Sequence, residues 1–487
     1  MSTIKKQGIR NTIITYAGVV IGFVSLLFIQ PNLLKPEELG LTKIIIAAAS
    51  LIATVLPLGV SSVTTKYFPY FRNQEKGHHG YFGLMLLFPL AGAVICGLLI
   101  YLFKDIIIDQ YKQQSYLFTQ YFNLLLPLSF IIGLNMTLNA YCSSLFKTTI
   151  ISFFEGILAR VLFIILIVVY YLRWIDLTQM MYLFVGIYLN QVIAMVIYIY
   201  SIDKPSFKLD SGILKSVGVN NLIRFGLLLT LANFSSIGLK HLDTILIGKY
   251  MSLDYVGIFT LAAFIGLVIE IPLTSLERIT HTKIAQAWSV NDTESIRKIY
   301  YQSVKYLMLI GGLLLVGIVS NITDLLSLLP APYHQGAGVA VIACVGAFLN
   351  VSTGVNSSIL FSSTKYMYGT YLLFLLLIMA FTLNIILIPM YGIVGAALAT
   401  AISSVVYNAI KYIIILRHFG MQPFNTGSLK IAGVIVFTIG VAYFIPVFPN
   451  AVVSMIIKSG VITLMYGVLV YMFNIIPEYH HLIQRKK

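Results

Sequence analysis

A few basic residues lie inside long apolar stretches of the chain or at their ends. A charge at the centre of a bilayer costs roughly 2.5 to 3.5 kcal/mol on insertion scales, so such residues are candidates for a functional site. A guanidinium or an ammonium group is well suited to bind an anion, above all a phosphate, through charge-assisted hydrogen bonds. The substrate-binding candidates are Arg160, Lys240, Lys66, Lys283 and Arg278.

Acidic and imidazole side chains in the same stretches have the chemistry to carry a coupling proton or sodium ion, or to gate transport. The coupling or gating candidates are Asp243, Glu270, Glu155 and His241. Glu270 stands two residues before Pro272, which loosens a helix, so it is either a proton or cation site or a protonated structural acid. The sequence has no metal-ligand spacing and no phosphate-binding glycine loop, so we expect no cofactor and no ATP hydrolysis.

Spacing along a helix allows a purely structural interpretation for one pair of these residues and disfavours it for another. Lys240 and Asp243 are three residues apart and could pair on one face of a helix. Glu155 and Arg160 are five residues apart, which is a poor spacing for such a pair. This spacing favours an Arg160 side chain that faces a water-filled cavity.

The elements that position these residues are transmembrane helices. Hydrophobic residues make up 59% of the chain and charged residues 10%, far from the balance of a soluble globular protein. Apolar runs near the roughly 20 residues that cross a bilayer recur over the entire length. We therefore predict an all-α polytopic membrane protein with about 14 transmembrane helices.

Residues 291–294, Asn-Asp-Thr-Glu, are an N-cap signal for a short amphipathic helix at the membrane surface.

Most of the 32 lysines and arginines lie in segments on the same side as the N-terminus. The positive-inside rule therefore predicts that both termini are cytoplasmic. The same sorting explains most of the net charge of +15, so nucleic-acid binding is not expected. In this assignment Lys411 belongs to the inner basic residues, whereas Lys43 and Lys458 belong to outer segments.

Features of the first half recur about 217 residues later. Lys66 corresponds to Lys283, and Gly40 corresponds to Gly257, both at an offset of 217. Self-similarity at a fixed period predicts two similar helical bundles with a binding site between them. Because Lys66 and Lys283 lie near the inner ends of their helices, they could also be anchors whose side chains extend to the cytoplasmic interface.

Asn135 and Asn350 extend this series at an offset of 215. We predict a six-helix lobe over 1–203, a cytoplasmic linker over 204–220, a second six-helix lobe over 221–418, and two additional helices with a cytoplasmic tail over 419–487. Basic residues from several helices would make the cavity between the lobes suitable for an anion. A lipid-linked pyrophosphate sugar fits this expectation, because its head group cannot cross hydrocarbon unaided and its tail cannot leave it.

Two segments resemble a known family. Residues 242–250, LDTILIGKY, with VGIF at 256–259, are similar to the seventh-helix signature of the polysaccharide transporter family. Asn384 with LIPMYGIVGAALAT at 387–400 resembles the junction between the family's eleventh and twelfth helices. This family comprises the O-antigen and oligosaccharide flippases of the multidrug/oligosaccharidyl-lipid/polysaccharide exporter superfamily. The resemblance makes Asp243 the acidic residue of the seventh-helix signature.

The resemblance implies a flippase rather than an enzyme. The expected substrate is an undecaprenyl-pyrophosphate-linked oligosaccharide, moved by alternating access from the inner to the outer leaflet of the bacterial cytoplasmic membrane. The expected pathway is O-antigen, capsule or exopolysaccharide synthesis, and the other expected partners are membrane lipids and a polysaccharide polymerase. We expect the protein to be a monomer.

Three other functions stay open. A cation-coupled multidrug exporter of the same superfamily would use acidic cavity residues, but the first helix here has none. A lipid II flippase has a similar substrate, although its arginine-rich first helix is not recognisable. A membrane glycosyltransferase would use an acidic pair such as Glu37 and Glu38 in the first outer loop. The repeat places Asp254 opposite Glu37, which favours a helix-capping turn instead.

Overall fold

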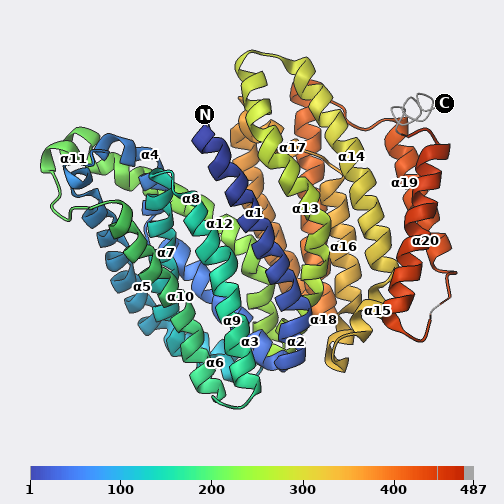
Figure 1. Cartoon of the computed structure of the whole chain (residues 1–487), viewed down its shortest axis with the longest axis horizontal. Helices are drawn as coiled ribbons and strands as arrows, with labels where there is room; N and C mark the ends of the chain where they lie inside the picture. Colours follow the sequence, from blue (N-terminus) through green and yellow to red (C-terminus); the bar gives the residue numbers. More distant parts are fainter. Residues whose placement is uncertain (1, 447, 476–487) are drawn as a thin grey trace. The chain divides into compact units, whose positions relative to one another are not determined.

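The computed structural model describes residues 2–446 and 448–475, and all regular structure in this range is helical (Figure 1). Twelve of these helices are long and apolar enough to cross a membrane. The predicted all-α, multi-pass membrane fold is therefore confirmed. The predicted C-terminal tail lies largely outside the described residues, and the chain divides into two compact units, Met1–Gly257 and Ile258–Lys487.

Unit 1 contains the first twelve α-helices and two π-helical segments that interrupt apolar spans. Its elements relevant to the site are α1 (Ser2–Val24), the π-helix η1 (Ser25–Ile29), α2 (Gln30–Leu33), α3 (Pro36–Val55), α4 (Val60–Phe71), α5 (Tyr81–Tyr111), α7 (Leu125–Ser144), α8 (Thr148–Phe153), the π-helix η4 (Phe154–Leu158), α9 (Ala159–Tyr171), α10 (Leu177–Ile202), α11 (Ser211–Val217) and α12 (Val219–Tyr250). Residues 204–210 of the predicted linker are not helical, whereas α11 lies within the linker. The lobe boundaries predicted from the sequence remain a prediction.

Helix α13 (Leu253–Ser289) begins in unit 1 and continues in unit 2. The helices that follow are α14 (Thr293–Ser320), α15 (Ile322–Ser327), α16 (Ala337–Val351), α17 (Asn356–Ser362), α18 (Tyr366–Phe419), α19 (Thr426–Ala442) and α20 (Ala451–Met472). The predicted 14 spans and the twelve long helices differ at two places. Helix α18 has 54 residues and is interrupted at Gly392 (φ 59°, ψ −139°), and α19 has only 17 residues. The count of 14 stays a prediction.

Helix ends follow the capping signals in the sequence. The backbone N–H of Lys35 donates to Glu38 Oε2 (2.9 Å) at the start of α3, and Tyr170 Oη donates to Glu38 Oε1 (2.6 Å). This acid therefore caps a helix, as the repeat predicted. Asp292 accepts from the backbone N–H of Ser295 (3.0 Å) and caps α14 itself. The predicted cap is confirmed, but the separate surface helix is wrong because α14 continues without a break from Thr293 to Ser320.

The internal repeat is visible where two equivalent glycines meet. A Cβ added to Gly40 in α3 would overlap the carbonyl oxygen of Leu253 and lie 3.1 Å from the nitrogen of Gly257. A Cβ added to Gly257 in α13 would overlap the carbonyl oxygen of Pro36 and lie 3.2 Å from the nitrogen of Gly40. Each helix therefore packs its glycine against the first turn of the other, which only a residue without a side chain permits.

Candidate functional site

Arg160 lies in unit 1 near the start of α9, directly after the π-helix η4. Its Nη1 donates a hydrogen bond to the carbonyl oxygen of Gly18 in α1. A Cβ added to Gly22, one turn farther along α1, would lie 2.8 Å from Arg160 Cζ. Gly22 thus leaves room for the guanidinium against the backbone of α1, whereas Gly18 leaves room for the backbone of Gly156 in η4. Single-turn π-helices are frequent at functional sites, because they re-aim the side chains that follow them.

Glu155 does not neutralise Arg160. Its Oε1 instead accepts a hydrogen bond from Asn139 Nδ2 in α7. Among the residues that the structure describes, the ion pairs are His78 with Asp203, His79 with Asp210 and Lys458 with Asp324. Arg160 is therefore a cation within an apolar span whose direct contact in the protein is a neutral carbonyl group. Such an uncompensated charge favours an anionic ligand.

A second polar contact supports the same π-helix. Asn135 Nδ2 in α7 donates to Gln191 Oε1 in α10 (3.1 Å), and Gln191 Nε2 donates to the carbonyl oxygen of Phe154 (3.2 Å). Both side chains are buried. The carbonyl oxygen of the first residue of η4 thus gains a side-chain donor from α10.

The other candidates in unit 1 lie on α4 and α12. Lys66 is exposed, and its Nζ lies 4.0 Å from the ring centroid of Phe225 and 5.0 Å from that of Tyr67. These cation–π contacts suit the anchor interpretation as well as a binding role. On α12, Lys240 is exposed, whereas His241 and Asp243 are half-buried.

In unit 2 the candidates Glu270, Arg278 and Lys283 all lie on α13. Arg278 and Lys283 are exposed, whereas Glu270 is half-buried. Glu270 Oε1 accepts a hydrogen bond from Asn350 Nδ2 in α16 (2.8 Å), and Asn350 Oδ1 accepts one from Asn408 Nδ2 in α18 (3.0 Å). The structure therefore joins Glu270 to a polar network and leaves the two basic residues at the surface of the unit.

This network reaches a lysine that the sequence analysis assigned to the inner segments. Lys411 in α18 is only 2% exposed, so it is buried among helices and does not face solvent. Its Nζ donates to Asn356 Oδ1 (2.9 Å) and Ser357 Oγ (2.8 Å) in α17, and it lies 4.2 Å from the ring centroid of Tyr407. Asn356 also donates to Asn408 Oδ1 (3.4 Å). Lys411 and Glu270 thus terminate one continuous chain of polar groups.

The two units share this arrangement. Asn135 pairs with Gln191 in unit 1, and Asn350 pairs with Asn408 in unit 2. The partners correspond at offsets of 215 and 217 residues. In each unit an asparagine also donates to a glutamate, Glu155 or Glu270. The sequence analysis missed Asn408 and Lys411, although applying the repeat offset to Gln191 identifies Asn408.

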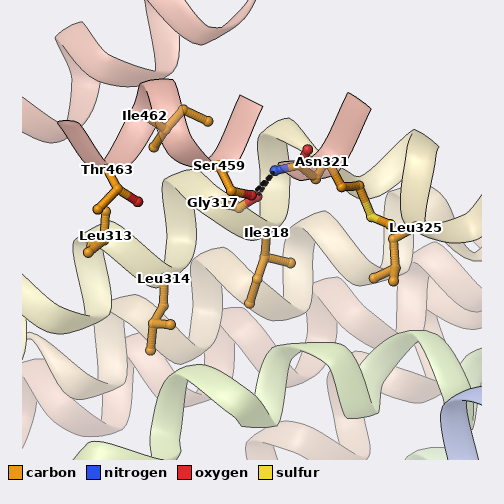
Figure 2. A pocket seen from close by; sticks show the side chains of 10 residues that line it. Leu313, Leu314, Gly317, Ile318, Asn321, Leu325, Ser459, Ile462 and Thr463 are labelled. Atoms are coloured by element: carbon orange, nitrogen blue, oxygen red, sulfur yellow. Dashed lines mark hydrogen bonds between the residues drawn. The ribbon is translucent and has the colours of Figure 1, made fainter. Parts of the chain in front are cut away.

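Unit 2 also contains a pocket of about 370 Å³ between α14, α15 and α20 (Figure 2). Its walls are mainly leucine and isoleucine side chains, and Asn321 Nδ2 donates to Ser459 Oγ across it (3.2 Å). Nearby, Lys458 Nζ donates to Asp324 Oδ2 (2.8 Å), and both side chains are buried. Lys458 is therefore buried and does not face solvent, and this pair joins α20 to α15.

Three comparisons with known proteins bear on this geometry. Residues 32–321 match the sequence profile of the polysaccharide biosynthesis protein family. A probable flippase, AglR, from Haloferax volcanii is 28% identical over 180 residues, which are 36% of this chain and 37% of that protein. The match thus spans little more than a third of the curated relative.

Solved structures share the fold. Lipid II flippase MurJ, in an inward closed conformation, superposes with a TM-score of 0.77 at 15% identity, covering 96% of this chain and 99% of MurJ. A multidrug resistance transporter of the MATE family, in an inward-facing conformation, gives a TM-score of 0.66 at 14% identity, covering 82% and 93%. The named relatives are flippases and transporters, and none is an enzyme.

Proposed function

The chain belongs to the polysaccharide biosynthesis protein family, and from this membership we propose that it is a flippase for lipid-linked oligosaccharides. The family profile matches more than half of the chain. The similarity to a probable flippase and the fold shared with a lipid II flippase support the same class of function. The polar head group of such a lipid needs a protein path, because unpaired polar groups are costly in hydrocarbon.

The proposed substrate is an undecaprenyl-pyrophosphate-linked repeat unit for O-antigen, capsule or exopolysaccharide synthesis. It would move from the inner to the outer leaflet of the bacterial cytoplasmic membrane by alternating access. In this proposal both termini are cytoplasmic, the protein is a monomer, and a polysaccharide polymerase receives the product.

One observation carries the proposal most directly: Arg160 is an intramembrane cation without a carboxylate partner in the described part of the chain. A guanidinium has five N–H donors, and the hydrogen bond from Arg160 to Gly18 engages one side-chain nitrogen, Nη1. The remaining donors match the oxygens of a phosphate, which accepts such hydrogen bonds in bidentate geometry. Lys240, Lys66, Lys283 and Arg278 remain proposed secondary contacts to the substrate.

Coupling to a proton or sodium gradient is the second part of the proposal. Glu155 and Glu270 each accept one asparagine hydrogen bond inside an apolar span. A carboxyl group in such a position can gain or lose a proton or cation as its surroundings change. Asp243 and His241, which lie next to Lys240 on α12, are proposed to gate this step.

The multidrug exporter is the alternative of the same fold whose substrate differs most from the proposed one. It predicts transport of organic cations, whereas the flippase predicts transport of an anionic lipid. The test is to reconstitute the protein in vesicles with a fluorescent lipid-linked oligosaccharide in one arm and a fluorescent organic cation in the other. Flipping of the lipid without accumulation of the cation supports the proposal, and the reverse result overturns it.

A further inference from the structure

We propose that Lys43 is a second phosphate-binding residue in unit 1 and that it forms, with Arg160, a two-point site for a diphosphate ester. This inference rests on the proposed flippase function and assigns a chemical preference to the same site. The sequence analysis placed Lys43 in an outer segment. The structure places it seven residues after the start of α3 at Pro36, which is roughly 10 Å along the helix axis.

Lys43 is held by buried polar groups. Its Nζ donates to Gln30 Oε1 in α2 (2.9 Å). Gln30 Nε2 in turn donates to Ser25 Oγ in the π-helix η1 (3.0 Å), and both of these side chains are buried. The amide of Gln30 is thus fixed at both ends, so its oxygen points at the ammonium group. An ammonium group has three donors, which leaves donors for a ligand.

Lys43 and Arg160 reach the same face of α9. Lys43 Nζ lies 5.9 Å from the ring centroid of Phe163. Phe163 follows Arg160 by three residues, and residues three apart on a helix are neighbours on one face. Helices α1 and α2, which contact the two cations, both pack against α9. Arg160 and Phe163, the residue of α9 beside Lys43, are therefore about one helical turn apart along this seam of unit 1.

Neither cation is neutralised within the described residues of the chain. The nearest acid on α3 is Glu38, and its carboxylate already accepts hydrogen bonds from Lys35 and Tyr170. Two uncompensated cations in an apolar span favour a ligand with more than one negative charge. Two cationic groups along one seam suit two linked phosphates better than one, so the site should prefer a diphosphate to a monophosphate.

The test compares two short lipid probes, farnesyl diphosphate and farnesyl monophosphate, with inorganic pyrophosphate as a third arm. Binding to the purified full-length protein in detergent is measured at equilibrium. We expect the wild type to bind the diphosphate lipid roughly tenfold more tightly than the monophosphate lipid. Lys43→Met should abolish this preference and Lys43→Arg should retain it. Gln30→Leu, which removes the acceptor that positions the ammonium, should weaken the preference in part.

Lys112→Met is the matched control, because Lys112 is an exposed lysine at the end of α5, and it should leave the preference unchanged. Thermal unfolding of each variant shows whether it is folded. If a folded Lys43→Met variant keeps the diphosphate preference, the Lys43 inference is wrong while the flippase function stands. If the wild type binds neither lipid, both proposals fail. Binding of inorganic pyrophosphate as tight as that of the diphosphate lipid would overturn recognition of an ester.

Discussion

Gly40 and Gly257, 217 residues apart, each pack against the first turn of the helix that carries the other. The obstruction that a side chain would meet at either glycine is backbone, namely the carbonyl oxygens of Leu253 and Pro36. Backbone atoms cannot rotate away as a flexible side chain can. The contact therefore ties the start of α3 to the start of α13.

We predict that Gly40→Val lowers the stability of the protein by about 1 to 3 kcal/mol, the usual effect of overpacking. Thermal unfolding in detergent measures this change. Gly186→Val in α10 is the control, because a Cβ there meets nothing within 4 Å. Equal unfolding temperatures for the two variants would show that the glycine contact does not stabilise the fold.

The second prediction concerns the hydrogen bond from Asn350 to Glu270. Glu270→Gln keeps an acceptor for Asn350 but removes the charge that could bind a proton or cation. We expect the variant to fold and to lose the acceleration of transport by an imposed proton or sodium gradient. Initial flipping rates in vesicles, with and without the gradient, measure this.

Glu294→Gln, at an exposed site in the first turn of α14, is the control for this experiment and should behave as the wild type. A Glu270→Gln variant that still responds fully to both gradients would exclude Glu270 from coupling.

The third prediction concerns the buried ion pair of Lys458 and Asp324. Removing one partner leaves an uncompensated charge and costs about 3 to 5 kcal/mol in buried pairs, whereas removing both is far less damaging. Lys458→Met should therefore destabilise the protein more than the double variant with Asp324→Asn. A double-mutant cycle on unfolding temperatures measures the difference, and additive effects of the two substitutions would contradict the pairing.

The fourth prediction is a pH dependence in the linker. Asp210 accepts from the backbone N–H of Gly212 (2.9 Å), and its Oδ2 lies 3.1 Å from His79 Nδ1. The Gly212 hydrogen bond, followed by the His79 contact, lowers the pKa of Asp210 below its ordinary value of 3.8. Because the folded state holds the lower pKa, the stabilisation is present above pH 3.8 and is lost as the pH falls through the folded pKa.

Hydrogen exchange of residues 203–218 as the pH is lowered from 6 to 3 measures this loss, after correction for the intrinsic exchange rate. Asp210→Asn keeps an oxygen for Gly212 but cannot titrate, so its protection should change less over the same range. An identical pH profile for the two proteins would remove Asp210 from this effect.

The fold class was predictable from the sequence because hydropathy is averaged over the roughly 20 residues of a transmembrane span. An average of this kind does not reveal a single charged residue that is buried within the span. Lys43, Lys411 and Lys458 were each counted with the basic residues of the inner or outer segments, yet each lies several residues inside a helix. An error of seven residues at a helix end displaces a side chain by roughly 10 Å, which separates a solvated lysine from a buried one.

The candidate site was predictable to a different degree in each unit. Arg160 was identified as a basic residue inside an apolar stretch, and the structure supplies its carbonyl contact with Gly18. The network around Lys411 was not predicted, because its members come from α13, α16, α17 and α18, and no local pattern connects these helices. Glu270 and Asn350 were named from the sequence, and the repeat offset from Gln191 adds Asn408 to them.

The most direct test of the flippase account is the rate at which a lipid-diphosphate oligosaccharide crosses vesicles that contain the wild type, Arg160→Ala or Arg160→Lys. Loss of one charge-assisted hydrogen bond should slow Arg160→Ala at least roughly tenfold, and Arg160→Lys should recover part of the rate. Equal flipping by Arg160→Ala and the wild type, at equal amounts of folded protein, would contradict a phosphate-binding role for Arg160.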